Sequence, residues 1–305
     1  MAITNSQAAQ LGLQLMYAMD MYTDMGDTPT TVTPDVDDRV KAANWDVKAY
    51  IVGDDAVIRD DKTLGGGDQV YYGFVAQNTQ DRSQFLAVVR GTHGIIEWIE
   101  DAEFVPIPHP NLKNGETVEQ GFWGIYSSMS LVDPTGAVIE DRAATGIPQV
   151  VGEGNLMVIG HSLGSTLATY LSLDLAMGPI GPKVSACMFA SPQTGDALFA
   201  RTYDTTLTDY RVFNYVLDVV PRVPMGLGYV TLPKATVLRP ATAEASIRVD
   251  VLCNHHVICY SAMLDFEASQ VTGVVKTDDD KQCAACILGP ETASPTMAKI
   301  LAGMV

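Results

Sequence analysis

Residues 160–164 read Gly-His-Ser-Leu-Gly, and this is the segment whose residue types most directly allow chemistry. An apolar run typical of a buried strand precedes it at 156–159, and residues 165–171 continue with helical periodicity. Glycine at both ends of the motif lets a strand turn sharply into a helix, because a Cβ atom there would collide with the neighbouring elements. Such a turn exposes the hydroxyl of Ser162, and the N–H of Leu163 at the helix start can face a developing oxyanion. The pattern therefore predicts a nucleophilic serine.

A serine nucleophile requires a base and a group that orients this base. A strand–G-x-S-x-G–helix segment is the nucleophile-elbow pattern of α/β-hydrolases, in which an acid and then a histidine follow the serine along the chain. The sequence has five histidines, which are His93, His109, His161, His255 and His256. His161 is expected to point away from the serine hydroxyl and to serve packing or a hydrogen bond. His255 and His256 lie downstream of Ser162, and the residues themselves leave the choice between them open.

Asp218 is the strongest candidate for the orienting acid. It follows an expected strand at 210–216, and its neighbours at 217 and 219–221 are all apolar. A carboxylate in such surroundings costs free energy unless it is paired, so an ordinary surface turn explains it poorly. Asp204 and Asp209 lie in a polar stretch and are interpreted as surface residues.

The surrounding elements must bring these residues to one edge of a sheet. Apolar runs predict strands at 45–52, 70–76, 85–90, 156–159, 187–190 and 210–216, with a late edge strand within 245–252. Strands that alternate with helices favour an α/β fold with a mainly parallel central sheet and helices on both faces. The apolar spacing of Leu11, Leu15 and Met19 predicts an N-terminal docking helix over about 6–22. We expect a single domain over 1–305, since no repeat or long linker interrupts the chain.

The composition restricts the partners. A formal net charge of −17 disfavours nucleic acid and anionic membrane surfaces. No stretch approaches the roughly 18 to 20 apolar residues of a membrane span, so no integral membrane association is expected. The first residues carry no basic side chain, and no signal peptide is expected. The chain is then either cytoplasmic or a mature secreted form that lacks its leader.

Five cysteines in a chain of 305 residues do not imply a disulfide framework. Cys283 and Cys286 form a single C-x-x-C with no second pair nearby, so a zinc site is disfavoured. A free thiol pair or one local bridge fits better, and Cys253 is a candidate member of such a bridge. No metal and no other cofactor is expected.

Five blocks of the chain, in the same order, resemble those of the fungal-type class 3 lipases, a family of the α/β-hydrolase superfamily. The blocks are Val89-Arg90-Gly91-Thr92 with Glu97-Trp98 and Asp101, Gly121-Phe122 with Tyr126, the 160–164 motif, 189–196 with Phe199, and Asn214 with 218–224. The resemblance covers about residues 70–265. The chain departs from the family pattern at Glu119, Gln193 and Ser165, where a histidine, an arginine and a second glycine are usual.

The resemblance implies a serine carboxylester hydrolase that acts on acylglycerols or similar lipid esters through a triad of Ser162, His255 and Asp218. Thr92 and Leu163 would supply the N–H groups of the oxyanion hole, with the Thr92 hydroxyl as a further donor. The alternatives are an esterase for short-chain or aromatic esters and a phospholipase A1. A more remote alternative is a non-catalytic binding scaffold on the same fold.

The choice of His255 over His256 also depends on the resemblance. Bacterial relatives place the catalytic histidine five residues before a tyrosine, and Tyr260 follows His255 at that distance. His256 instead directly precedes an expected helix over 257–265.

The same resemblance places a lid over 94–103, directly after Thr92. On a helix, Ile95, Ile96, Trp98, Ile99 and Ala102 would share one side, with Glu97, Glu100 and Asp101 on the other. When closed, such a lid would cover Ser162. When open, it would offer its apolar side to acyl chains or, transiently, to a lipid surface, although its acidic side disfavours anionic lipid. An ordinary surface helix packed on the core would show the same apolar stripe.

Overall fold

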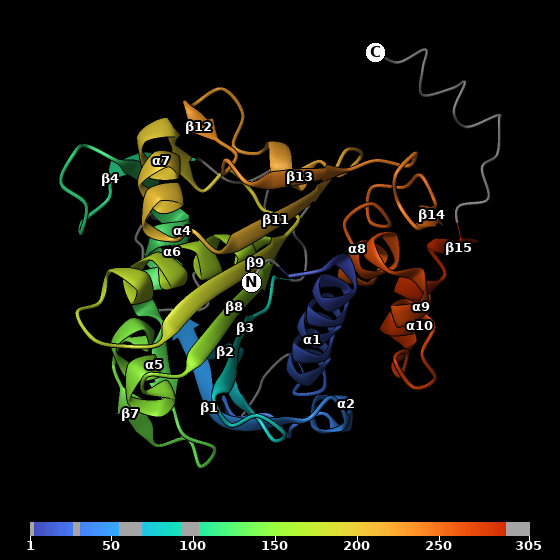
Figure 1. Ribbon diagram of the computed structural model, residues 1–305, viewed down its shortest axis with the longest axis horizontal. Coiled ribbons are helices and arrows are strands. Elements are labelled where there is room, and N and C mark those ends of the chain that lie inside the picture. Colours follow the sequence, from blue (N-terminus) through green and yellow to red (C-terminus); the bar gives the residue numbers. More distant parts are fainter. Residues whose placement is uncertain (1–2, 27–30, 55–68, 93–103, 291–305) are drawn as a thin grey trace.

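The computed structural model describes residues 3–26, 31–54, 69–92 and 104–290 (Figure 1). Over these residues a nine-stranded sheet forms the centre of the molecule. Across this sheet the strands follow the order β13 (Ala235–Leu238), β11 (Tyr210–Tyr215), β9 (Lys183–Phe189), β8 (Asn155–His161), β3 (Gln84–Val89), β2 (Gln69–Asn78), β1 (Trp45–Asp54), β6 (Ser130–Val132) and β7 (Val138–Glu140). The strands expected in the first 216 residues coincide with β1, β2, β3, β8, β9 and β11.

The strands from β13 to β3 pair in parallel, whereas β2 and β6 run against the rest of the described sheet. Parallel neighbours need crossover connections, and the helices α6 (Leu163–Met177) and α7 (Ala197–Thr206) supply two of them. The mainly parallel sheet that the sequence predicts is therefore confirmed. Its geometry brings the carboxyl ends of β3, β8 and β11 to one edge, and Thr92, Ser162 and Asp218 follow these ends.

Helices cover both faces of the sheet (Figure 1). On one face α1 (Asn5–Thr23) and α8 (Val257–Leu264) pack together, with α9 (Phe266–Ser269) and α10 (Asp278–Ala284) beside them. The other face carries α4 (Gln120–Ser128), α5 (Ala143–Val151), α6 and α7. The adjacent residues Val88 and Val89 of β3 enter opposite cores, as the alternation of a strand requires.

Two smaller sheets lie outside the central one. One is built from β4 (Pro106–Pro108), β5 (Thr117–Glu119), β10 (Gly195–Asp196) and β12 (Tyr229–Val230). In the other, β14 (Ala245–Ile247) pairs with β15 (Ile287–Pro290).

The edge strand expected within 245–252 is therefore wrong in part, since β14 ends at Ile247 and does not join the central sheet. The chain turns after it because Asp250 Oδ1 accepts hydrogen bonds from the backbone N–H groups of Leu252 and Cys253, at 3.0 and 3.2 Å. These donors are thereby withdrawn from a strand ladder.

The helix α1 lies where the sequence predicts the docking helix. A capping box of Thr4 and Gln7 begins it. It then packs closely along α8, and Gly12 allows this approach, because a Cβ atom there would lie 2.4 Å from Ser261 Oγ. The candidate lid over 94–103 lies outside the described residues.

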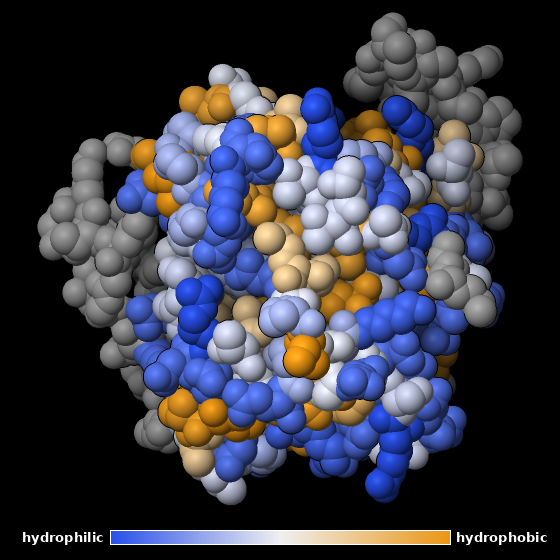
Figure 2. All heavy atoms as spheres, turned by 60° about the vertical axis from the view of Figure 1, so that its left-hand side comes forward, coloured by the Kyte–Doolittle hydropathy of each residue, from blue (hydrophilic) through white to orange (hydrophobic). Residues whose placement is uncertain are grey.

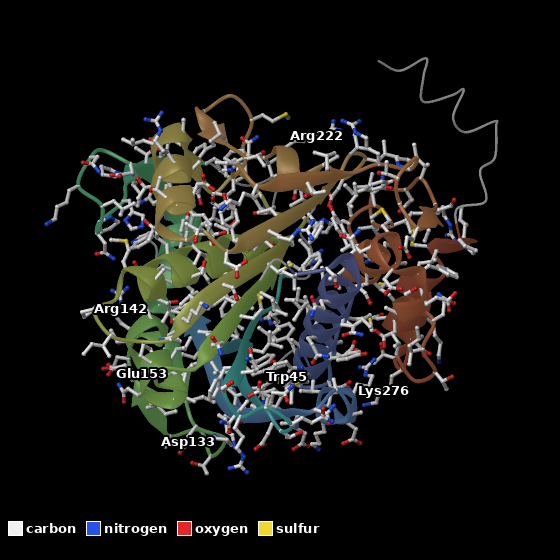
Figure 3. The ribbon with its side chains drawn as sticks, in the orientation of Figure 1. Trp45, Asp133, Arg142, Glu153, Arg222 and Lys276 are labelled. Atoms are coloured by element: carbon white, nitrogen blue, oxygen red, sulfur yellow. A yellow bond between two sulfur atoms is a disulfide. The ribbon has the colours of Figure 1, made fainter. Side chains whose placement is uncertain are left out.

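On the face in Figure 2, hydrophobic residues lie in separate groups among hydrophilic ones. The charged side chains of Asp133, Arg142, Glu153 and Lys276 lie at the periphery (Figure 3). Of the helices described, none combines the length and the apolar character needed to span a membrane.

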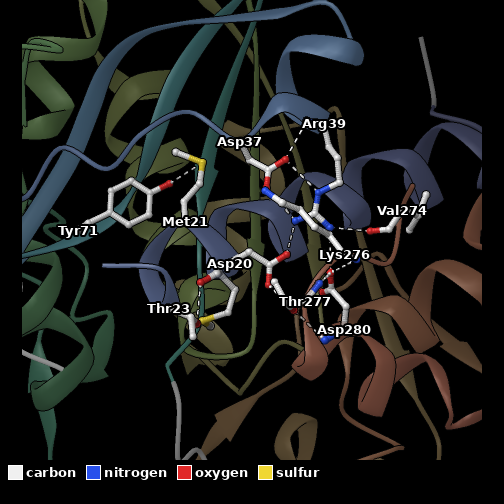
Figure 4. Close-up of polar contacts among 11 residues, drawn as sticks. Asp20, Met21, Thr23, Asp37, Arg39, Tyr71, Val274, Lys276, Thr277 and Asp280 are labelled. Carbon is white, nitrogen blue, oxygen red and sulfur yellow. Dashed lines mark hydrogen bonds and ion pairs between the residues drawn. The ribbon is translucent and has the colours of Figure 1, made fainter. Parts of the chain in front are cut away.

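Arg39, in the short helix α2 (Asp38–Ala42), links the N-terminal helices to α10 (Figure 4). Its guanidinium donates to Asp20 of α1, to Asp37 at 2.9 Å and to Asp280 of α10 at 2.9 Å. All three carboxylates are less than a tenth exposed, and Lys276 Nζ adds a contact to Asp37 at 3.2 Å. Removing one partner of such a buried network leaves uncompensated charge, so the network fixes how α1, α2 and α10 meet.

This network predicts a pH dependence of stability. Burial and the neighbouring Asp280 raise the pKa of Asp20 to about 7. Between about pH 4 and pH 7 the folded state therefore holds a proton that the unfolded state has released, and the contribution of Asp20 to stability falls as the pH rises. Asp20→Asn lacks this titration. The unfolding free energy of the variant minus that of the wild type should therefore be larger at pH 8 than at pH 5. Urea unfolding at both pH values measures this, and an equal difference at both would contradict it.

Candidate active site

Ser162 lies at a strained turn between β8 and α6. Its φ of 59° and ψ of −131° fall in a region that residues with side chains rarely adopt. The flanking glycines make the turn possible, because a Cβ atom at Gly160 would lie 2.3 Å from Gly164 O and one at Gly164 would lie 2.3 Å from Arg90 O. The local geometry is thus the sharp strand-to-helix turn that the 160–164 motif predicts.

Asp218 and His255 form a buried pair. His255 Nδ1 lies 2.9 Å from Asp218 Oδ2, and the aspartate side chain is wholly buried. The same oxygen accepts a hydrogen bond from the hydroxyl of Tyr260 at 2.8 Å, and Oδ1 accepts one from the N–H of Val220 at 2.9 Å. These donors compensate the burial of the carboxylate, which the apolar sequence around it made a requirement.

The structure brings His255, and not His256, to Asp218. His256 is the N-cap of α8, and its Nδ1 lies 3.2 Å from Cys283 Sγ, which directs this ring toward α10. Burial lowers the pKa of His256. Of the two adjacent histidines, His255 therefore has the geometry of a base held by a carboxylate.

The atoms that would exchange a proton are both available. Ser162 Oγ and His255 Nε2 are buried, and neither has a hydrogen-bond partner among the described residues. His161 supports His255 from the side, since its Nε2 lies 2.8 Å from the His255 carbonyl oxygen and the two rings are 4.7 Å apart. Burial holds the pKa of His161 well below its usual value, so this supporting ring is neutral.

The candidate oxyanion residues lie on two sides of Ser162. Leu163 is the first residue of α6, and Thr92 follows Gly91, which is packed against the elbow. A Cβ atom at Gly91 would lie 3.2 Å from Ser162 Cβ. Of the residues predicted to contact substrate, Ile95, Ile96, Trp98 and Ile99 lie outside the described part of the chain.

Two supporting residues were not given a role by the sequence analysis. Tyr260 connects β11 to α8, because its hydroxyl accepts from the N–H of Tyr215 at 2.8 Å and donates to Asp218. Arg90 fixes the segment before Thr92 by donating to the carbonyl oxygens of Tyr71 and Gly91, each at 2.7 Å. In the sequence, Arg90 directly follows an apolar strand, where a charged residue needs partners. This is the signal that could have identified its role.

A disulfide joins Cys253 to Cys286, with Cα atoms 5.3 Å apart. It ties the turn before His255 to the segment between α10 and β15. The sequence left the partner of Cys253 open, and the structure identifies it as the second cysteine of the C-x-x-C. Cys187, Cys259 and Cys283 carry free thiols. Over the described residues, no group of three or more histidine, cysteine, aspartate or glutamate side chains is placed to hold a metal ion.

A cleft of about 430 Å³ adjoins this site, and Gly91, Thr92, His161 and His255 are among the residues that line it. Residues of α1, α8 and α10 line it as well, whereas Ser162 and Asp218 are not among its described lining residues. The site therefore combines a serine at an elbow, a carboxylate-held histidine and adjoining space for a ligand.

Comparison with known proteins gives matches to lipases. Residues 86–227 match the family described as Lipase (class 3). The chain is 31% identical over 195 residues to a secreted mono- and diacylglycerol lipase A of Penicillium cyclopium, a match that covers 59% of this chain and 60% of the fungal protein. It is 30% identical over 185 residues to phospholipase A1-II 6 of Oryza sativa subsp. japonica, covering 50% of this chain and 45% of the rice protein. The chain thus spans 60% or less of the length of these curated relatives.

The fold has a solved counterpart over more of the chain. The mono- and diacylglycerol lipase from Aspergillus oryzae superposes with a TM-score of 0.59 at 20% identity, covering 85% of this chain and 98% of that structure. Together with the mainly parallel sheet and the elbow, this likeness confirms the α/β-hydrolase fold.

The disulfide generates a prediction about stability. The bridge closes a segment with a sequence separation of 33 residues. The chain-entropy account then gives a stabilisation of roughly 3 to 4 kcal/mol. We expect the double variant Cys253→Ala with Cys286→Ala to lose stability of this order in denaturant unfolding and to lose ester hydrolysis at a lower temperature. Cys283→Ser is the control, because it leaves the bridge intact, and an equal loss in this control would contradict the role of the bridge.

Proposed function

We propose that this protein hydrolyses carboxylic esters of acylglycerols or similar lipids with Ser162 as nucleophile, and the match of residues 86–227 to the class 3 lipase family supports the proposal. The observation that carries the proposal is the buried Asp218–His255 pair beside the elbow serine. A histidine held through Nδ1 by a carboxylate presents Nε2 as a base. Here that nitrogen has no hydrogen-bond partner among the described residues, and we assign to it the proton of Ser162.

The reaction follows from these groups. His255 Nε2 takes the proton of Ser162 while Oγ attacks the ester carbonyl carbon, and Asp218 stabilises the imidazolium that forms. The N–H groups of Thr92 and Leu163 bind the oxyanion of the tetrahedral intermediate. Collapse of this intermediate expels the alcohol, which receives the proton from His255, and leaves an acyl-serine. Water, deprotonated by the same histidine, then releases the acid. No cofactor takes part in these proposed reaction steps.

The finer substrate class also belongs to the proposal. The similarity to a mono- and diacylglycerol lipase supports a neutral lipid ester, and the similarity to a phospholipase A1 keeps that activity as the second candidate. The complete set of serine, histidine and aspartate speaks against a binding scaffold, which would have no need to keep all three.

Transient contact with a lipid interface is a further part of the proposal. Val219, Met225 and Leu227 follow Asp218 closely along the chain, and they are 39%, 74% and 48% exposed. Large apolar side chains exposed in the segment after Asp218 are suited to an apolar or zwitterionic surface.

We also propose that the protein works in an oxidising compartment. Disulfides persist outside the reducing cytosol, and the Cys253–Cys286 bridge supports such a location. The Penicillium relative is described as secreted.

Ser162→Ala should abolish turnover of p-nitrophenyl esters without lowering the unfolding free energy. The reason is that Ser162 Oγ makes no hydrogen bond within the described structure, so its removal costs little packing. Steady-state rates and urea unfolding of the purified variant measure both quantities. Turnover above about a thousandth of the wild-type rate would overturn the assignment of the nucleophile, since members of a triad act as a unit.

The two adjacent histidines provide a matched comparison. His255→Ala should cost about as much in kcat as Ser162→Ala, because both remove a member of the same unit. His256→Ala should retain activity within about tenfold, because its ring contacts Cys283 and not Asp218. The reverse order of the two losses would show that the catalytic histidine is His256.

A further inference from the structure

The cleft beside His255 is formed by parts of the chain that lie far apart in sequence. Leu15, Met16 and Met19 of α1 contribute apolar side chains to its lining, and Val257 and Ile258 of α8 contribute others. The first turns of α10 complete it with Asp279, Asp280 and Gln282. These three helices lie side by side on one face of the sheet (Figure 1). The cleft is thus apolar along its helical walls and polar where α10 reaches it.

The charges around the cleft are of one sign. No lysine or arginine is among the described residues that line it, whereas Asp20, Asp279 and Asp280 are. Arg39 compensates Asp20 and Asp280 from behind. Asp279 is exposed on α10, and its carboxylate acts electrostatically on His256 and Cys283 in the same wall. Asp279 is therefore the acidic group in this wall that a bound ligand would meet.

The chemistry of the triad decides which part of an ester this cleft receives. The histidine that activates the serine must later protonate the departing alkoxide, so the alcohol portion lies next to Nε2. His255 lines the cleft, is only 7% exposed, and its Nε2 has no partner among the described residues. Thr92, the proposed oxyanion residue, lines the same cleft, so the cleft adjoins two groups of the proposed reaction.

We propose that the cleft between α1, α8 and α10 binds the alcohol portion of the substrate and selects uncharged polyhydroxy alcohols, such as glycerol, over alcohols that carry phosphate. The inference rests on the proposed ester hydrolysis at Ser162. Hydroxyl groups can donate to Asp279 and to the amide oxygen of Gln282, and the carbon backbone can pack on Met16 and Met19. A phosphate group would meet a carboxylate with no lysine or arginine to balance it, and the net charge of −17 adds repulsion at longer range.

The test uses soluble esters that share one acyl group and differ in the alcohol. The substrates are 1-monobutyrylglycerol, butyrylcholine and 1-butyrylglycerol 3-phosphate, and kcat/KM is compared because it reports acylation. We expect the wild type to prefer the glycerol ester to the phosphate ester by at least about tenfold at low salt. Asp279→Asn should narrow this ratio by about three- to tenfold, and Asp279→Lys should narrow it further. High salt should weaken both effects.

Asp278→Asn is the matched control. Asp278 lies on the same helix, is also exposed and pairs with Lys281 at 2.7 Å, but it is not among the residues that line the cleft. Its variant carries the same change in net charge and should leave the ratio as in the wild type. Equal effects of the Asp278 and Asp279 variants, or a wild type that favours the phosphate ester, would overturn the proposal.

Failure of the proposed function would look different. In that case p-nitrophenyl butyrate, whose alcohol needs no polar contact, would not be hydrolysed by the wild type at all. If the wild type hydrolyses this ester but the ratio of kcat/KM between the glycerol and phosphate esters does not change in the Asp279 variants, only the inference about the cleft is overturned. Faster hydrolysis of butyrylcholine than of the glycerol ester would also overturn it, since the cleft would then select a cation and not a polyol.

Discussion

The buried carboxylate of Asp218 is the group around which the other contacts of the site are arranged. A charge without access to water needs donors, and the fold delivers them from three directions, through His255, Tyr260 and the N–H of Val220. His255 and Tyr260 both belong to the α8 region, so the carboxylate at the end of β11 determines where α8 must lie. The contacts that compensate the burial of Asp218 therefore also position His255, the proposed base.

The position of α8 in turn depends on both ends of the chain. α1 packs along it through the gap at Gly12, and the Arg39 network holds α1 and α2 against α10. The Cys253–Cys286 bridge joins the turn before α8 to the segment after α10. The family match at 86–227 contains Ser162 and Asp218 but not His255. The segments outside this match are thus needed to bring the histidine to the other two residues.

The sequence predicts those features that depend on local sterics or on apolar patterning. The elbow at Ser162 follows from two glycines, and the main strands follow from runs such as those of β3 and β8, because neighbouring atoms decide both. The residues alone do not distinguish His255 from His256. The His255 ring is oriented by Asp218 and the His256 ring by Cys283, and both contacts form only in the folded chain. The partner of Cys253 and the Arg39 network were likewise hidden, because their members meet only after α1 and α10 have packed. β14 ended early for a local reason, the Asp250 turn, which the apolar pattern of 245–252 concealed.

Two buried atoms without partners agree with the proposed reaction and lower the stability of the fold. Ser162 Oγ and His255 Nε2 each give up hydrogen bonds to water and gain none within the described structure. Each such group costs about 1 to 3 kcal/mol, and the positive φ of Ser162 adds backbone strain. Alanine at 162 would remove the unpaired hydroxyl, and glycine would also relieve the backbone strain, whereas the cost at His255 Nε2 would remain. A fold that served only to bind would gain stability by this change. In the proposed reaction, by contrast, Ser162 Oγ must be available to the ester carbonyl carbon and His255 Nε2 to the leaving alkoxide.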